Sequence, residues 1–278
     1  MNTPTATVRH QLALALQQGL PRIEAQMLLL HVLGRAGTDR AWLIAHDDDL
    51  LPPDAQARFA ALCARRLAGE PVAYLTGRKA FYGLELEVDA RVLDPRPDTE
   101  TLVDWALELL APVAGPRVVD LGTGSGAIAL ALQSQRPDAR VTAVDFSQDA
   151  LEVARANVQR LQLPVQLVRA SWLEGVPGPF DAIVSNPPYI REDDPHMPAL
   201  RHEPRQALTS GADGLQDLRA IIAQAPAALA PEGWLLLEHG WDQAEAVQTL
   251  LRAAGWRQVQ SRQDLAGHAR CTGGQRPC

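Results

Sequence analysis

The first 80 residues carry apolar side chains at helical spacing. Helices are predicted over residues 21–34, 53–69 and 71–77, because each segment opens at a proline, which suits a first helical turn, and closes at a glycine. We expect residues 1–80 to form a small helical domain that docks a substrate or partner, or covers a site as a lid. A structural cap is the alternative, because this segment carries no catalytic pattern.

Between residues 81 and 92 the apolar positions change to a period of two and alternate with acidic residues. This period is typical of strands, and a turn is expected at Asp89-Ala90, so the segment predicts a β-hairpin. We assign residues 81–97 as a β-hairpin linker between two domains. Thr99 follows the linker, and its hydroxyl is expected to cap the next helix.

Strand and helix patterns alternate through the rest of the chain, residues 98–278. The strand patterns cover residues 117–121, 141–145, 165–168, 182–185 and 234–238, and the helical patterns cover residues 126–135, 147–162, 215–229 and 243–254. This alternation predicts an α/β domain with a doubly wound, mostly parallel sheet. Two weaker strand patterns, over residues 256–260 and 269–272, are expected to complete one edge of the sheet.

The composition narrows the class of protein without indicating a chemistry. Of 278 residues, 46% are hydrophobic and 21% are charged, an ordinary balance for a globular protein with a large core. The net charge of −7 argues against broad electrostatic binding of nucleic acid. Cys63, Cys271 and Cys278 are scattered without metal-ligand spacing, and no signal sequence or membrane-length apolar run is found. We therefore expect a soluble cytoplasmic protein without a bound metal.

A glycine-rich loop, Asp120-Leu121-Gly122-Thr123-Gly124-Ser125-Gly126-Ala127, follows the first strand pattern of the second domain. Its glycines let the backbone approach a ligand, and its spacing fits both a nicotinamide dinucleotide and S-adenosylmethionine. Asp145 ends the next strand pattern, where a carboxylate can accept the ribose hydroxyls of either cofactor. Asp120 favours S-adenosylmethionine, because a carboxylate suits a cationic methionine group and does not suit a pyrophosphate. Trp172 either borders the adenine pocket or packs in the core.

The stretch Ser185-Asn186-Pro187-Pro188-Tyr189 follows a buried strand pattern, at the end of the sheet where open α/β folds bind ligands. Asn186 offers a side-chain carbonyl, and the two prolines offer carbonyls but no N–H, so the turn is rich in fixed acceptors. A substrate –NH2 group, whose two hydrogens need two acceptors, fits such a corner. Tyr189 adds a flat aromatic face for a planar amide or base. Taken alone, a plain surface turn explains Asn-Pro-Pro about equally well.

Together, these motifs resemble those of class I methyltransferases. More specifically, they are similar to the HemK-like N5-glutamine methyltransferases, which modify peptide chain release factors. The similar segments also include Phe81 to Leu84, Pro95 to Glu100, Glu203-Pro204, Ala207-Leu208, Asp213 to Leu215, Glu238 to Gly240, Asp264, Gly267 and Arg270. His202 stands where an aromatic residue is expected, a small departure on the substrate side.

The resemblance implies a Rossmann-like class I methyltransferase sheet, mostly parallel with an antiparallel last strand, and S-adenosylmethionine as cofactor. It assigns the cofactor to Asp120, Gly122, Thr123, Gly124, Ser125, Gly126, Asp145, Trp172 and Asn186. The substrate it implies is the glutamine of the Gly-Gly-Gln loop of class-1 release factors, held by Asn186, Pro187, Pro188 and Tyr189. Of these, Asn186, Pro187 and Tyr189 are expected to be catalytic. A monomer without a nucleic-acid substrate is expected.

Three other functions are compatible with the residues alone. An N6-adenine or N2-guanine methyltransferase of DNA or RNA would present a similar –NH2 group, but it would need a basic channel, which the acidic total does not favour. A nicotinamide-dependent oxidoreductase would use the same glycine loop. A non-catalytic cofactor-binding or adaptor protein is the third. The tripeptide Gly273-Gly274-Gln275 matches the modified loop, and we expect this match to be a coincidence. The scattered His196, His202 and His239 are expected to be structural.

Overall fold

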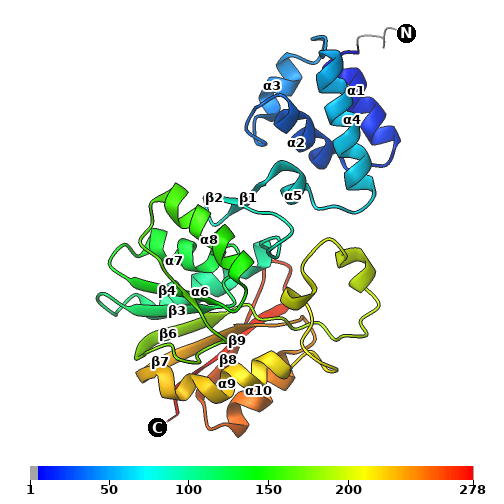
Figure 1. Cartoon of the computed structure of the whole chain (residues 1–278). Helices are drawn as coiled ribbons and strands as arrows, with labels where there is room; N and C mark the ends of the chain where they lie inside the picture. The colour runs from blue at the N-terminus through cyan, green and yellow to red at the C-terminus, as the bar shows by residue number, and fades with distance from the viewer. Residues whose placement is uncertain (1–5, 278) are drawn as a thin grey trace. The chain divides into compact units, whose positions relative to one another are not determined.

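The N-terminal part of the chain folds into a helical unit with its own core (Figure 1). The computed structural model describes residues 6–277, and the boundary between two compact units falls between Arg78 and Lys79. The first unit holds α1 (Val8–Gln17), α2 (Arg22–Val32), α3 (Arg40–Ala45), α4 (Pro53–Leu67) and α5 (Val72–Thr76). The predicted helices over residues 21–34, 53–69 and 71–77 are therefore confirmed as α2, α4 and α5.

Burial explains which of these helices the sequence reveals. Leu28 to Leu30 of α2 are fully buried and share a core cluster with Phe59 of α4. In α1 only Val8 and Ala15 are buried, and in the six-residue α3 only Leu43 is buried. The apolar period that marks a helix is weak where so few side chains reach the core, and α1 and α3 were accordingly missed.

The hairpin lies earlier in the chain than the sequence predicts. Strands β1 (Arg78–Phe81) and β2 (Leu84–Glu87) pair across a two-residue turn at Tyr82 and Gly83. A turn does form at Asp89-Ala90, where the Val92 N–H donates to the Asp89 carbonyl at 3.2 Å, but its prediction as the hairpin turn is wrong, because it follows β2.

The true turn has a conformation that the sequence hides. Tyr82 and Gly83 have φ values of 49° and 75°, and positive φ at both positions is what a type I′ hairpin turn requires. Tyrosine rarely adopts positive φ. Contacts with α6 hold it there: the Tyr82 N–H donates to Glu100 at 2.8 Å, and the Tyr82 hydroxyl donates to Asp104 at 2.6 Å.

A seven-stranded sheet forms the centre of the second unit. Its strands are β3 (Arg117–Leu121), β4 (Arg140–Asp145), β5 (Gln166–Arg169), β6 (Phe180–Ser185), β7 (Leu229–Glu238), β8 (Arg257–Gln263) and β9 (Ala269–Gln275). They lie in the order β5-β4-β3-β6-β7-β9-β8; neighbours from β5 to β7 are parallel, and β9 runs antiparallel to β7 and β8. This confirms the α/β class and the mostly parallel sheet with an antiparallel last strand.

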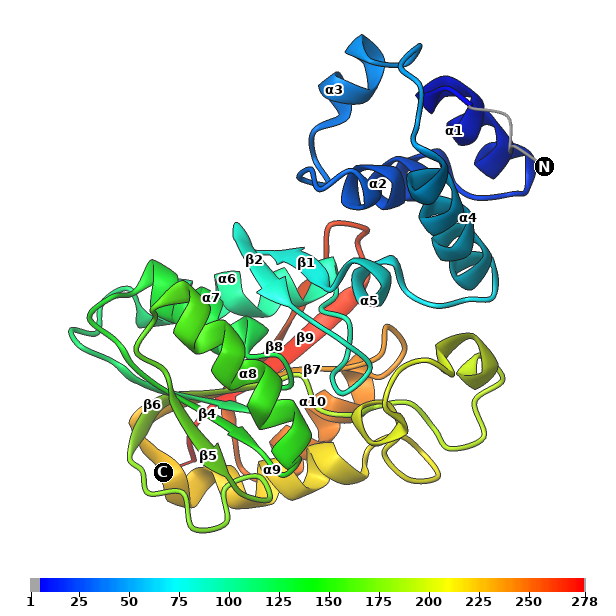
Figure 2. The same ribbon diagram turned by 45° about the horizontal axis from the view of Figure 1, so that its top comes forward.

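Helices cover both faces of this sheet (Figure 1 and Figure 2). On one face lie α6 (Glu100–Leu110), α7 (Ala127–Gln135) and α8 (Gln148–Leu161), and on the other lie α9 (Gln216–Ala228) and α10 (Ala244–Ala253). Leu218 of α9 and Val247 of α10 are fully buried in one core cluster with Leu235 and Leu237 of β7. Coverage of both faces is why the central strands read as nearly continuous apolar runs.

The strand order creates a crevice between β3 and β6. From β3 the chain moves outward to β4 and β5 and then returns to place β6 on the other side of β3. Leu121 and Ser185, the last residues of these two strands, are direct partners, and the Ser185 hydroxyl donates to the Leu121 carbonyl at 2.7 Å. Such a reversal of strand order is where open α/β sheets bind ligands. The loops after β3 and β6 therefore face the same opening.

Candidate functional site

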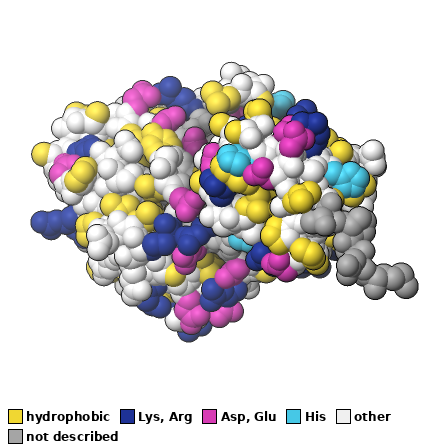
Figure 3. Space-filling view, turned by 90° about the horizontal axis from the view of Figure 1, so that it is seen from above, with side chains coloured by type: hydrophobic (Ala, Val, Ile, Leu, Met, Phe, Trp, Pro, Cys, Tyr) yellow, Lys and Arg dark blue, Asp and Glu magenta, His cyan; other side chains and the backbone are white. Residues whose placement is uncertain are grey.

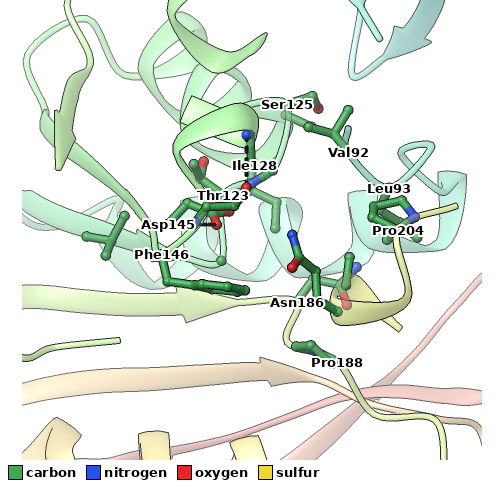
Figure 4. Close-up of a pocket in the computed structure, with 18 of the residues that line it drawn as sticks. Val92, Leu93, Thr123, Ser125, Ile128, Asp145, Phe146, Asn186, Pro188 and Pro204 are labelled. Atoms are coloured by element: carbon green, nitrogen blue, oxygen red, sulfur yellow. Dashed lines mark hydrogen bonds between the residues drawn. The ribbon is translucent and has the colours of Figure 1, made fainter. Parts of the chain in front are cut away.

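A cavity of about 370 Å³ lies beside the carboxyl ends of β3, β4, β5 and β6 (Figure 4). This volume lies in the range of small-molecule sites. Of the residues expected to form the site, Gly122, Thr123, Gly124, Ser125, Asp145, Trp172, Asn186 and Pro188 line the cavity, whereas Asp120, Gly126, Pro187 and Tyr189 do not. The structure thus gathers residues from loops far apart in sequence around one hollow.

The glycine loop runs directly against Trp172. Gly122, Gly124 and Gly126 all have positive φ, a conformation that glycine adopts without strain. A Cβ added at Gly122 would stand 3.4 Å from the Trp172 ring. The loop therefore presents bare backbone to the cavity at this point, and the indole ring forms part of the cavity wall.

Asp120 supports the loop from behind. Its carboxylate is fully buried, and Oδ2 accepts hydrogen bonds from the Thr123 hydroxyl at 2.6 Å and from the Ala129 N–H at 3.2 Å. Oδ1 has no hydrogen-bond partner among residues 6–277. Burial raises the pKa of Asp120 to about 7, against the lowering by these two donors. A buried, incompletely paired carboxylate of this kind favours a cationic ligand nearby.

Asp145 faces the cavity with both oxygens already oriented. Oδ2 accepts from the Gly124 N–H and Oδ1 from the Ser147 N–H, each at 2.9 Å. Burial raises the pKa of Asp145, and the backbone donors oppose that rise. Each oxygen keeps a lone pair for a further donor, such as a ribose hydroxyl.

Phe146, which directly follows Asp145, was not predicted from the sequence to be a site residue. Phe146 is 51% exposed and lines the cavity (Figure 4). Trp172 is another residue of the cavity lining. The available signal was an aromatic residue placed immediately after a strand end that already carried a candidate ligand. Together the two rings give the cavity aromatic walls suited to a planar base.

The Asn186 corner lies between the glycine loop with Asp145 on one side and Leu93 with Pro204 on the other (Figure 4). Nδ2 of Asn186 donates to the Thr99 hydroxyl at 3.2 Å, which leaves Oδ1 available to accept. Tyr189 is fixed at both ends: its carbonyl accepts from Gln243 Nε2 at 3.0 Å, and its hydroxyl donates to Glu238 at 3.4 Å. Burial raises the pKa of Tyr189, so the phenol stays protonated.

Thr99 does not act as the predicted helix cap. A short 3₁₀ turn, Pro97–Thr99, precedes α6, and the Thr99 side chain makes no capping hydrogen bond. Its hydroxyl instead accepts from Nδ2 of Asn186 at 3.2 Å, and it also influences the carboxyl group of Glu238 at the end of β7. Burial raises the pKa of Glu238 to about 7, against the lowering by the Thr99 hydroxyl and the Arg270 guanidinium.

The remaining candidate groups lie outside the cavity. His239 is buried between Thr272 and the Gly240 carbonyl, and burial lowers its pKa, which fits the expected structural role. Gln275 lies in β9 opposite Trp234, at the end of the sheet away from the cavity. Cys278 is outside the described residues. Within residues 6–277, no group of three or more metal-ligating side chains occurs, and no helix is long and apolar enough to cross a membrane.

Comparisons with known proteins show the family and the fold of this chain. A family model described as Methyltransferase small domain matches residues 99–254, and one described as PrmC N-terminal domain matches residues 7–77. A release factor glutamine methyltransferase of Bordetella pertussis is 53% identical over 92% of this chain and 95% of its own length. One from Burkholderia pseudomallei is 47% identical over the full length of both chains. A methyltransferase structure from Pyrococcus furiosus, 21% identical, matches with a TM-score of 0.54 over 77% of this chain and 98% of that chain, which supports the fold.

Proposed function

This chain belongs to the family of release factor glutamine methyltransferases, and from that premise we propose how its own residues carry out the reaction. The proposed substrate is the glutamine side-chain amide in the Gly-Gly-Gln loop of a class-1 release factor, and the product carries a methyl group on that nitrogen. The observation that supports this most is the orientation of Asn186. Its Nδ2 is occupied by Thr99, so Oδ1 is free to accept a substrate N–H beside the cavity.

The cavity fits S-adenosylmethionine, the cofactor of this family. We assign the ribose hydroxyls to Asp145, whose oxygens are already oriented by backbone donors. The adenine fits between the aromatic walls at Phe146 and Trp172, and the bare backbone of the glycine loop lies against the rest of the molecule. The buried carboxyl group of Asp120 lies behind that loop, and a cationic ligand would favour its ionised form. The bound cofactor supplies a methyl group on a positively charged sulfur, which is an activated donor.

The protein's task is then alignment and charge placement. An amide nitrogen is a poor nucleophile, because its lone pair is delocalised into the carbonyl. In the proposed complex, Asn186 Oδ1 and the backbone carbonyl of Pro187 accept the two N–H groups of the glutamine. These two bonds draw electron density onto the nitrogen and stabilise the positive charge that develops there. Tyr189 limits rotation of the amide plane by packing against it.

The N-terminal unit is proposed to dock the release factor. A groove between α1, α2 and α3 is lined by apolar side chains, including Leu12, Leu16 and Ile44, and Ile44 is 74% exposed. Exposed apolar side chains gathered in one groove are typical of a protein-binding surface. We also propose that the enzyme acts as a monomer in the cytoplasm. Sedimentation of the purified chain tests the first point, and fractionation of cells tests the second.

The competing substrate is the amino group of a nucleic-acid base. On the face drawn in Figure 3, basic and acidic side chains are interspersed rather than gathered into one basic expanse. With a net charge of −7, this surface favours a protein substrate over a polyanion. The deciding experiment offers labelled S-adenosylmethionine and the enzyme to release factor, DNA and RNA in parallel. Label on a release-factor glutamine supports the proposal, and label on nucleic acid alone contradicts it.

A further inference from the structure

The carboxylate of Glu203 joins two segments that line the cavity. Oε1 of Glu203 accepts from Arg96 Nη2 at 2.6 Å, and Oε2 accepts from the Asp94 N–H at 3.4 Å. Asp94 and Arg96 lie in the linker between β2 and α6, whereas Glu203 lies in the long loop between β6 and α9. Both oxygens of one carboxylate therefore hold the linker to a loop that is 107 and 109 positions away in the chain.

The ion pair between Arg96 and Glu203 is shielded from water at its acidic end. The Glu203 side chain is 4% exposed, and the Arg96 side chain is 35% exposed. Asp94 lies beside the pair, 3.6 Å from the Arg96 guanidinium and 2.9 Å from the Lys79 ammonium group. A carboxylate buried to the extent of Glu203 needs a charged partner, so the contact between the two segments is costly to break.

The residues next to these charged groups form an apolar wall of the cavity. Leu93 and Pro95 of the linker and Pro204 of the loop all line the cavity, and each directly adjoins a residue of the charged group in sequence. Leu93 and Pro204 lie on the side of Asn186 opposite the glycine loop (Figure 4). Because the glycine loop is assigned to the cofactor, this apolar wall faces the space that is left for the substrate.

We propose that Glu203 and Arg96 are positioning residues for methyl transfer, which hold the apolar wall against the methylene groups of the substrate glutamine. The inference rests on the proposed function, in which Asn186 and Pro187 bind the amide end of that side chain. The methylene groups that join the amide to the backbone form no hydrogen bonds, so only packing can place them. A fixed wall beside them limits where the amide nitrogen can lie relative to the methyl donor.

A contribution to stability alone does not explain a buried ion pair at this place. The removal of two charges from water costs about as much free energy as their attraction returns, so such pairs add little net stability. What Glu203 and Arg96 do provide is a fixed partner for each segment, because any arrangement that separates them leaves a buried charge unpaired. Apolar contacts are non-directional and do not supply this selection. The ion pair therefore sets where the two halves of the wall meet.

The test measures kcat and KM for release factor at saturating S-adenosylmethionine, and the cofactor Kd separately by calorimetry. Arg96→Met and Glu203→Leu each break the ion pair and keep an apolar side chain in its place. We expect each to lower kcat/KM by about 10- to 100-fold, the effect of misplacing a reacting group by about 1 Å, and to leave the cofactor Kd near wild type. Glu203→Gln keeps the length and an acceptor oxygen, so its loss should be smaller than that of Glu203→Leu.

The double variant Arg96→Met/Glu203→Leu separates positioning from stability. Arg96→Met leaves the Glu203 carboxylate buried without its cation, whereas the double variant removes that carboxylate too, and Asp94 keeps Lys79 as a partner. The double variant should therefore unfold at a higher temperature than Arg96→Met, while its kcat/KM stays as low as in the slower single variant. Turnover that recovers together with stability would overturn the proposal. So would wild-type kcat/KM in both single variants, or a loss confined to the cofactor Kd.

Arg219→Met is the matched control, because Arg219 pairs with Asp213 of the same loop at 2.5 Å but both side chains are about half exposed. Exposed ion pairs contribute little, so Arg219→Met should keep wild-type kcat/KM, and an equal loss there would overturn the proposal. If Arg96→Met does not fold, Glu203→Leu, Glu203→Gln and the double variant decide by their kcat/KM values. Wild-type enzyme that leaves the release-factor glutamine unmodified contradicts the proposed function itself, whereas an active wild type with unchanged kcat/KM in the ion-pair variants overturns only the roles of Arg96 and Glu203.

Discussion

Nδ2 of Asn186 lies 3.2 Å from the hydroxyl of Thr99, although 87 positions separate the two residues in the chain. The contact forms because the turn before α6 and the loop after β6 meet at the crevice between β3 and β6. The acceptor face of Asn186 is thus set by the fold as a whole rather than by the local Asn-Pro-Pro-Tyr turn.

Gly214 holds the same corner from another side, and its replacement should impair turnover. Gly214 has a φ of +73°, and a Cβ added there would overlap the carbonyl oxygen of Tyr189. We expect Gly214→Ala to lower kcat at least about tenfold, because misplacing a substrate-positioning group costs rate steeply. Gly214→Ala should also lower the free energy of unfolding by more than roughly 1–2 kcal/mol, which is the cost of placing an alanine in the left-handed backbone region.

Gly267→Ala is the matched control for that experiment. Gly267 has a similar φ of +85°, but an added Cβ would meet no atom within 4 Å. Gly267→Ala should lower the thermal unfolding temperature through backbone strain alone, and it should keep wild-type kcat. Equal kcat values in the two variants would mean that Gly214 does not position Tyr189.

The stability of the ligand-free enzyme should change with pH through Glu238. Its pKa is raised from an ordinary value near 4.5 to about 7, so between these pH values the folded chain holds a proton that the unfolded chain has lost. Stability from this group is present at low pH and is lost as pH rises toward 7. Glu238→Gln removes the contribution, and its free energy of unfolding relative to wild type should rise with pH by up to about 1.4 kcal/mol per pH unit.

Denaturant unfolding of both proteins across pH 5 to 8, roughly the span around these pKa values, measures this difference. Asp98 and Arg270 are present in both proteins, and so are the buried Tyr189 and Cys271, so their effects largely cancel. A difference that stays constant across this pH range would show that the pKa of Glu238 is not raised in the folded chain.

Much of the sheet could be predicted from the sequence, for physical reasons. Buried strands such as β3 and β6 read as apolar runs, and the motifs at their ends, the glycine loop and the Asn186 turn, follow them directly. The hairpin turn was misplaced, because Tyr82 adopts a positive φ only through contacts with α6, which no local pattern reveals. Thr99 was interpreted as a cap for a similar reason: its hydrogen-bond partner, Asn186, is distant in the chain.

Release-factor docking by the N-terminal unit predicts a split between KM and kcat. Ile44→Asp places a charge on the exposed apolar groove and should raise the KM for release factor about tenfold, while kcat at saturating substrate stays near wild type. Leu67→Asp is the control, because Leu67 is an exposed apolar residue of the same unit that lies outside the groove lining. If both variants behave alike, the groove is not the docking surface.

The Gly273-Gly274-Gln275 tripeptide should not be methylated by the enzyme that carries it. Gln275 is held in β9, where its side-chain oxygen accepts from Gln258 at 2.9 Å, and it lies at the far end of the sheet from the cavity. Incubation with S-adenosylmethionine alone should leave the intact mass unchanged. A methyl group located on Gln275, absent in a Gln275→Ala control, would show that this strand opens and reaches a site.

The most direct test of the account is the rate of glutamine methylation by Asn186→Ala, measured by mass spectrometry of a class-1 release factor and paired with calorimetry of S-adenosylmethionine binding. We expect wild-type enzyme to place one methyl group on the glutamine of the Gly-Gly-Gln loop. We expect Asn186→Ala to bind the cofactor still but to turn over at least about 10²-fold more slowly, since one oriented acceptor for the amide is gone. Wild-type turnover by the variant with the cofactor bound would contradict the central role given to Asn186.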